Sequence, residues 1–178
     1  MRACLHAVIA ACLFGLPAGS VVAKQIQLLH GELSFATPED VSQASGPIAD
    51  TDRYSVLADL TSADHTFSVR VTYGKHSLKK PDLADFLQQK ISSYSKPSVN
   101  RPRFRWLRHT LVERQDRQWA DVSFTHDIPS GSHVYTRSIS CFRRGRLLEI
   151  WVLTRRAADH TQKAGVDRLV DSVQLRTG

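Results

Sequence analysis

Residues 118–153 read QWADVSFTHDIPSGSHVYTRSISCFRRGRLLEIWVL and contain three strand-like segments separated by two short turns. The segments are 118–126, 133–143 and 147–153, and the turns between them carry Pro and Gly, which punctuate strands. Strands joined by connections this short are antiparallel, because a parallel pair needs a crossover of a dozen or more residues. We therefore predict an antiparallel meander, with 147–153, its most apolar strand, near the centre of a sheet.

The segments on either side add further strands and two helices. Period-two alternation of apolar residues is typical of half-buried strands, and apolar spacings of three and four are typical of amphipathic helices. The strands predicted on this basis are 25–29, 32–35, 54–60, 65–73 and 103–112. The predicted helices are 81–94, opened by Pro81, and about 157–172, capped by Asp159 or Thr161, and the predicted loop is 37–52. Together these elements predict an α+β fold, an antiparallel β-sheet with helices packed on it.

Residues 1–23 have the pattern of a secretory signal peptide. Arg2 supplies a positive start, and residues 7–16 form an apolar run of ten. Small residues precede Lys24 at the positions that signal peptidase reads, so we predict cleavage after Ala23. The apolar run is too short to span a membrane, which takes about 20 residues. The mature protein is therefore expected to be periplasmic or secreted, and not membrane-spanning.

The cysteines bear on anchoring and on redox state. Residues 9–12, IAAC, resemble a lipobox, so the alternative is a lipoprotein anchored through Cys12. The apolar run before Cys12 is short for that purpose and continues past the cysteine, which favours cleavage after Ala23. Cys141 is then the only cysteine of the mature chain, so no internal disulfide is possible. Its place in an alternating run predicts a buried, small apolar side chain.

Cleavage after Ala23 leaves 155 residues, 24–178, a length typical of one domain with a single core. We therefore expect a single α+β domain. Only one cationic residue, Arg2, leaves with the signal, so 23 Lys and Arg face 17 Asp and Glu, and the net charge is +6. Arginine outnumbers lysine 17 to 7 in the full chain, which is typical of a GC-rich bacterial genome.

Four stretches of the chain resemble a known family. They are the Phe-containing strand that runs into a Pro turn at 32–38, the mid-chain helix at 83–94, the strand RLLEI at 146–150 and the closing helix with RLVDSV at 168–173. In this order they resemble the PsbP/DcrB-like α/β/α sandwich proteins, over nearly the whole mature chain. The resemblance implies a mostly non-enzymatic role, because members serve as exported accessory subunits, lipoproteins and effector chaperones. It assigns no functional residue in this sequence.

A basic segment at 101–109, RPRFRWLRH, is the candidate binding site. The candidate partner-binding residues are Arg101, Arg103, Arg105, Trp106 and Arg108. In a strand, the three arginines at odd positions share one face and the aromatic residues share the other. Guanidinium groups pair with carboxylates and phosphates, so the predicted partner is an acidic protein, an acidic lipid headgroup or a lipopolysaccharide phosphate. The alternative is a solvated edge strand, charged against aggregation. Nucleic acid is not expected, since no recognition motif accompanies the segment.

Patterns for catalysis and metal binding are sparse. His126 and His133 flank the turn at 127–132 and are predicted to face each other across the hairpin, near Asp127. Zinc takes three or four ligands, and no third ligand is identifiable, so two surface histidines are the preferred interpretation. Ser123 and His126 lie three apart on one strand and point to opposite faces, which argues against a catalytic triad. We therefore predict no catalytic residue, no metal site and no cofactor.

These observations predict an exported, non-enzymatic envelope protein that acts by binding another macromolecule, as an accessory or immunity-type protein. Its partner is expected to be a protein of the envelope that presents an acidic or anionic surface. One alternative is a carrier of a small ligand or lipid, with a pocket between helix and sheet. A further alternative is a metal-dependent or hydrolytic enzyme.

Overall fold

The computed structural model of the chain describes residues 23–38, 40–43, 54–75, 82–96, 101–157 and 159–176. The predicted signal peptide lies outside these residues apart from Ala23, and so do Cys12 and Pro81. The strands are β1 (Ala23–Leu28), β2 (Leu33–Pro38), β3 (Val41–Gln43), β4 (Tyr54–Ser62), β5 (Phe67–Gly74), β6 (Arg105–Arg114), β7 (Arg117–Asp127), β8 (His133–Arg143), β9 (Arg146–Thr154) and β10 (Gln174–Leu175). The helices are α1 (Leu83–Ser95) and α2 (His160–Asp171).

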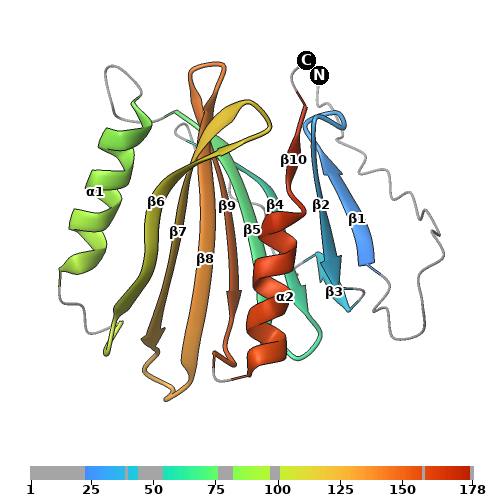
Figure 1. Cartoon of the computed structure of the whole chain (residues 1–178). Helices are drawn as coiled ribbons and strands as arrows, with labels where there is room; N and C mark the ends of the chain where they lie inside the picture. Colours follow the sequence, from blue (N-terminus) through green and yellow to red (C-terminus); the bar gives the residue numbers. More distant parts are fainter. Residues whose placement is uncertain are drawn as a thin grey trace.

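The larger sheet has seven strands in the order β3-β4-β5-β9-β8-β7-β6, and all its neighbouring strands are antiparallel (Figure 1). The meander predicted from residues 118–153 forms β7, β8 and β9, and β9 is the fourth of the seven strands. Its predicted central position is therefore confirmed. Leu148, Ile150 and Val152 of β9 all have 0% exposure and contribute to the main apolar core.

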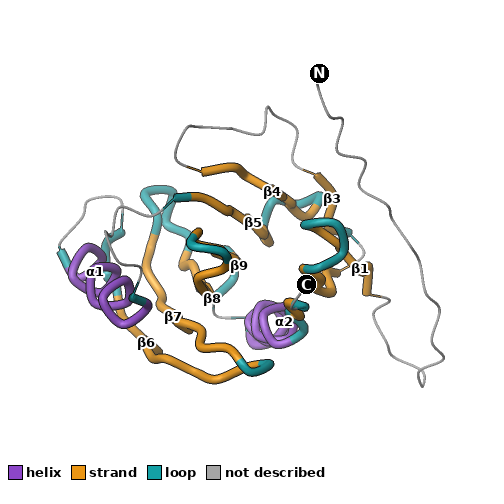
Figure 2. The backbone as a smooth tube through the Cα atoms, turned by 90° about the horizontal axis from the view of Figure 1, so that it is seen from above, coloured by secondary structure: helices purple, strands orange, loops and turns teal. Residues whose placement is uncertain are grey.

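The two helices contact opposite faces of this sheet. Successive residues of a strand point to opposite faces, and two neighbours in β8 contact different helices. Ser138 accepts a hydrogen bond from Lys90 of α1 at 2.9 Å, whereas Arg137 lies 3.2 Å from Asp167 of α2. Figure 2 shows the helices well apart, with α1 against β6 and β7. The predicted α+β class, with helices packed on an antiparallel sheet, is confirmed.

A second, smaller sheet packs beside α2. Its order is β1-β2-β10, and both of its pairs are antiparallel. Leu33 and Phe35 of β2 join Val166 and Leu169 of α2 in the main core. The prediction of a loop over 37–52 is wrong at residues 41–43, which form β3. β10 is a further strand that the sequence analysis did not predict. With three and two residues, these strands are too short to show an alternating pattern.

Both helices begin at an aspartate cap. Asp82 accepts hydrogen bonds from the backbone N–H groups of Ala84 and Asp85 at 2.7 and 3.1 Å, so α1 begins after Asp82 rather than at Pro81. Asp159, one of the two caps that the sequence predicted, caps α2 in the same way, whereas Thr161 lies inside the helix. Such caps satisfy amide groups that have no partner within the helix. No helix in the described part of the chain is long and apolar enough to cross a bilayer.

A buried ion pair attaches α1 to the sheet. Lys90 Nζ donates to Glu149 Oε1 at 2.7 Å and lies 3.9 Å from the centre of the Trp151 ring. Burial lowers the pKa of Lys90, and attraction to Glu149 opposes that change. Ser140 also donates to Glu149 Oε1, at 3.2 Å. Lys90 can occupy an inward position of an amphipathic helix because the Glu149 carboxylate neutralises its charge.

Truncation of the central strand is expected to destabilise the protein strongly. Ile150→Ala removes a side chain with 0% exposure and leaves a cavity, so chemical denaturation should show a loss of about 2–5 kcal/mol in unfolding free energy. Leu107→Ala is the control, because Leu107 is 46% exposed and a surface substitution changes stability by less than about 0.5 kcal/mol. Equal effects of the two substitutions would contradict this assignment of the core.

Candidate functional site

β6 lies at one edge of the seven-stranded sheet and contains three of the five predicted binding residues. Its pairing with β7 is regular except at a bulge, where the register shifts between Trp106 and Arg108. The extra residue, Leu107, is exposed. A bulge interrupts the alternation of side chains along a strand. Arg105 and Arg108 therefore lie on the same face, the one that α2 contacts, although they are three residues apart.

The five predicted residues do not share one surface. β6 begins at Arg105, and Arg103 lies in the turn before it with a φ of 52°, so the chain at 101–104 is not a strand. The prediction that Arg101, Arg103 and Arg105 share one strand face is therefore wrong. Arg103 instead forms an ion pair with Asp127. Trp106 lies on the opposite face of β6, toward α1.

An aromatic cluster surrounds Trp106 on the α1 side of the sheet. Its rings, whose neighbouring centres lie 5.0 to 6.4 Å apart, are Tyr94, Phe104, Trp106, Phe124 and Trp151. The Arg101 guanidinium lies 4.1 Å from the centre of the Tyr94 ring, a cation–π contact. Arg101 Nη1 and His126 Nδ1 are buried without a hydrogen-bond partner among the described residues. Arg101 and Trp106 therefore pack against this end of α1.

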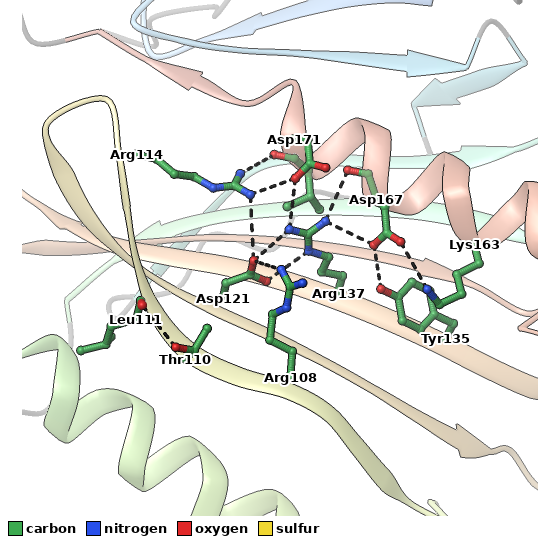
Figure 3. Close-up of polar contacts among 11 residues, drawn as sticks. Arg108, Thr110, Leu111, Arg114, Asp121, Tyr135, Arg137, Lys163, Asp167 and Asp171 are labelled. Atoms are coloured by element: carbon green, nitrogen blue, oxygen red, sulfur yellow. Dashed lines mark hydrogen bonds and ion pairs between the residues drawn. The ribbon is translucent and has the colours of Figure 1, made fainter.

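A network of charged side chains lies between α2 and the strands β6, β7 and β8 (Figure 3). At its centre is Asp121, whose side chain has 0% exposure. Asp121 accepts hydrogen bonds from Arg137 Nη2 at 2.8 Å and from Arg108 Nη1 at 3.1 Å, and Arg114 Nη2 lies 3.9 Å from it. Burial opposes the ionisation of Asp121, but the hydrogen bonds and charges of Arg137 and Arg108 outweigh it and hold its pKa below the usual value.

Arg137 connects this network to α2. Its Nη1 lies 3.2 Å from Asp167 Oδ1, and its Nη2 lies 3.1 Å from Asp171 Oδ1. Burial opposes the charge of Arg137, but the carboxylates around it raise its pKa. Tyr135 donates to Asp167 Oδ1 at 2.7 Å, and burial together with this hydrogen bond raises the pKa of Tyr135. Both side chains therefore keep their protons at neutral pH.

The network lines a groove of about 590 Å³, which we name the α2 groove. Its lining includes Leu107, Arg108, Ser123, Tyr135, Lys163 and Asp167. Of these residues only Arg108 was predicted to be functional. Leu107 precedes it in β6, whereas the other four come from β7, β8 and α2, which only the folded sheet brings together. One sequence signal was available: Asp121 lies between Ala120 and Val122, and Arg137 lies between Thr136 and Ser138, so each is a charged residue in the middle of a strand.

The two histidines of the β7–β8 hairpin do not face each other. Asp127 pairs with His133 and His126 pairs with Val134, so the predicted juxtaposition is wrong by one residue of register. His133 Nδ1 lies 2.7 Å from Asp127 Oδ1, and this contact lowers the pKa of Asp127. Within the described ranges, no three His, Cys, Asp or Glu side chains gather in a way that would hold a metal ion.

Cys141 is part of the main core, as predicted. It has 0% exposure, and burial raises the pKa of its thiol to about 12. A thiol that stays protonated at neutral pH is a poor nucleophile. Its place in β8 therefore supports a packing role.

The stability that Asp121 contributes is expected to depend on pH. Because its pKa is lower in the folded state than the value of about 3.9 in an unfolded chain, its contribution is fully present above that value and is lost as the pH falls through the folded-state pKa. Asp121→Asn removes the charge that neutralises buried Arg137 and should cost about 3 kcal/mol at pH 7. Chemical denaturation at several pH values should show that the difference in unfolding free energy between Asp121→Asn and the parent narrows below about pH 4.

Asp116→Asn is the control, because Asp116 lies exposed in the β6–β7 turn and should change the unfolding free energy by less than about 0.5 kcal/mol. A cost of Asp121→Asn that stays constant from pH 7 down to pH 2 would contradict the ionic role of Asp121.

Comparison with known proteins identifies the fold. No family model matches the sequence, and no curated protein matches it. The solved structure of cyanobacterial PsbP (CyanoP) from Synechocystis sp. PCC 6803 is similar, with a TM-score of 0.62 at 10% identity over 92% of this chain and 98% of that chain. The Saccharomyces cerevisiae Ran-binding protein Mog1p has a TM-score of 0.55 at 12% identity, over 88% of this chain and 96% of that chain. PA94 from Pseudomonas aeruginosa, a protein of unknown function, has a TM-score of 0.53 at 10% identity, over 88% and 99%. The chain therefore has the PsbP/DcrB-like fold that its sequence resemblance implied.

Proposed function

We propose that this protein is exported, has no enzymatic activity and binds another protein of the cell envelope through the free edge of β6. The observation that carries the proposal is the length, exposure and edge position of this strand. β6 has ten residues, ends the seven-stranded sheet and contains no buried residue. The strand at the other edge, β3, has only three residues. β6 is thus the long edge at which another chain can pair.

An edge strand presents backbone N–H and C=O groups that can pair with a further strand. Extended segments of partner proteins use such edges, gaining affinity from main-chain hydrogen bonds and specificity from alternate side chains. On one side of β6 a partner strand would meet Arg105, Leu107 and Arg108, and on the other side Trp106. Arg101 and Arg103 lie just before the strand. Arg103 is already paired with Asp127, and Arg101 packs on Tyr94, so the positive charge that suits an acidic partner comes from Arg105 and Arg108.

The structural comparisons support a binding role in general terms. Mog1p, which shares the fold, is described as a Ran-binding protein. A fold by itself does not assign a partner. The choice of β6 therefore rests on its length, position, exposure and charge.

The second candidate function is that of a small-ligand carrier, which the α2 groove favours. The groove lies between a helix and the sheet, as the carrier hypothesis requires, and its volume of about 590 Å³ is in the range of small-molecule sites. Its lining is charged, with Arg108, Lys163 and Asp167 among its residues. This favours a polar ligand over a lipid acyl chain.

Site-specific cross-linking tests the edge of β6. A photoreactive amino acid in place of Leu107 should cross-link one protein in the envelope fraction at a defined mass. The same amino acid in place of Ser42, which is exposed on the opposite edge strand β3, should not. Adding Arg105→Glu should reduce the cross-link at least tenfold, because a negative charge would face an acidic partner.

The melting temperature should stay unchanged in the Arg105→Glu variant, because Arg105 is exposed. Arg70→Glu is the charge-matched control, since Arg70 is an exposed arginine in β5, away from this edge. Persistence of the cross-link in Arg105→Glu, or an equal cross-link from position 42, would rule out the β6 edge.

Export is tested by the mass of the protein in the envelope fraction. Cleavage after Ala23 should leave a chain of residues 24–178, which lacks only the first residue of β1. Intact-mass spectrometry that finds this species supports export. A mass that includes residues 1–23 would contradict cleavage, and a lipid-modified chain that begins at Cys12 would indicate a lipoprotein.

A further inference from the structure

We infer that the α2 groove is a binding site for a single carboxylate, held between Arg108 and Lys163 at the edge of β6. The inference rests on the proposed function, because the carboxylate is assigned to an acidic side chain of the partner segment that pairs with β6. It adds a recognition site to that interface and specifies the chemistry of the partner.

The deep part of the groove is already saturated. Arg137, with 5% side-chain exposure, contacts carboxylate groups of Asp121, Asp167 and Asp171 at 2.8 to 3.2 Å. Asp121 has 0% side-chain exposure and is contacted by three arginines. The charges in this part of the groove are already paired with one another, so they hold the strands and α2 in place and none is available to a ligand.

The cations at the surface of the groove retain free donors. Arg108 is 52% exposed in its side chain, and among the described residues it contacts one carboxylate, that of Asp121, through Nη1 alone. Its other guanidinium N–H groups remain available for a forked pair with a ligand carboxylate. Lys163 is 38% exposed, and its one ion pair in the described chain, with Asp167, is long at 3.4 Å. Two cations with spare donors therefore line the same groove.

Hydroxyl groups complete the polar lining. Ser123 and Tyr135 both line the groove, and both residues are less than one tenth exposed. Tyr135 stays protonated, and its hydrogen goes to Asp167 Oδ1 at 2.7 Å. Ser123 lies opposite Arg108 in the pairing of β7 with β6. The hydroxyl group of Ser123 forms a hydrogen bond with Tyr135, so a carboxylate beside Arg108 meets a polar wall whose geometry these two side chains fix.

The balance of charge selects the ligand. Arg108, Arg114, Arg137 and Lys163 supply four positive charges, and Asp121, Asp167 and Asp171 supply three negative ones. The groove therefore has an excess of one positive charge. A carboxylate, with one negative charge, neutralises that excess. A phosphate group carries up to two, which exceeds this excess, and the two carboxylates of α2 repel it more strongly than they repel a carboxylate.

The position of the groove indicates where the carboxylate comes from. Leu107 and Arg108 belong both to the edge strand β6 and to the lining of the groove. A partner strand paired with β6 would lie about 4.8 Å from it, with alternate side chains on the α2 face. An acidic residue at one of those positions reaches toward Arg108. The same carboxylate on a free small molecule is the other source that the experiment must distinguish.

Peptide titration followed by NMR tests the inference with the full mature chain. The probe is a capped five-residue peptide of threonine with glutamate at its second and fourth positions, and the reference has glutamine there. The glutamate peptide should shift the amide signals of Ser123 and Tyr135 and bind at least tenfold more tightly than the glutamine peptide. Arg108→Gln and Lys163→Gln should each weaken its binding about tenfold, the size of one charge-assisted contact.

Arg70→Gln is the matched control, because Arg70 is also an exposed arginine that pairs with one carboxylate of the described residues, that of Asp59. Its binding should equal that of the parent. A titration with sodium acetate tests whether a free acid binds. Acetate alone should shift the amide signals of Ser123 and Tyr135 far less than the glutamate peptide does. Equal shifts with acetate would overturn assignment to a partner's side chain. Equal affinity for the two peptides would overturn the carboxylate site, while the cross-link from position 107 separately decides whether β6 binds a protein.

Discussion

On each face of the seven-stranded sheet a buried cation forms an ion pair across the contact between helix and sheet, and the rest of the architecture depends on this arrangement. On the α1 face, Lys90 reaches Glu149 at 2.7 Å. On the α2 face, Arg137 joins Asp121 to the two aspartates of the helix. Because neighbouring residues of β8 and β9 point to opposite faces, each pair can be satisfied only by one register of the sheet. The helices are thereby restricted to one position on each face.

Buried ion pairs of this kind add little net stability, because the cost of removing charges from water offsets much of their attraction. Apolar burial supplies the stability, through residues such as Ile139 and Ile150, which have 0% exposure. The ion pairs instead penalise alternative packings, since any slip of β8 would leave Arg137 without its partners. Arg137 supplies the inner partner of Asp121, and Arg108 adds a contact through Nη1 alone, so the other guanidinium N–H groups of Arg108 have no carboxylate partner among the described residues.

Local features of this fold could be predicted from the sequence, and non-local ones could not. The strands within residues 118–153 and the cap at Asp159 follow from alternation and from side-chain chemistry within a few residues. The bulge at Leu107 depends on how β6 pairs with β7, and the groove depends on four elements that meet only in the folded chain. Regular alternation along β6 would put Arg108 on the same side as Trp106, and only the register shift at the bulge puts it on the face of Arg105.

One extra residue in β6 affects both the α2 groove and the pairing properties of this edge. By interrupting the alternation, Leu107 brings Arg108 to the face of Asp121 and so completes the groove. By twisting the strand locally, the same bulge disfavours pairing between two copies of the chain, which natural edge strands must avoid. Two copies of β6 would also bring their arginines together, whereas an acidic strand would neutralise them. The bulge and the arginines thus both disfavour pairing of two copies at this edge, and under the proposed function the same arginines favour an acidic partner strand.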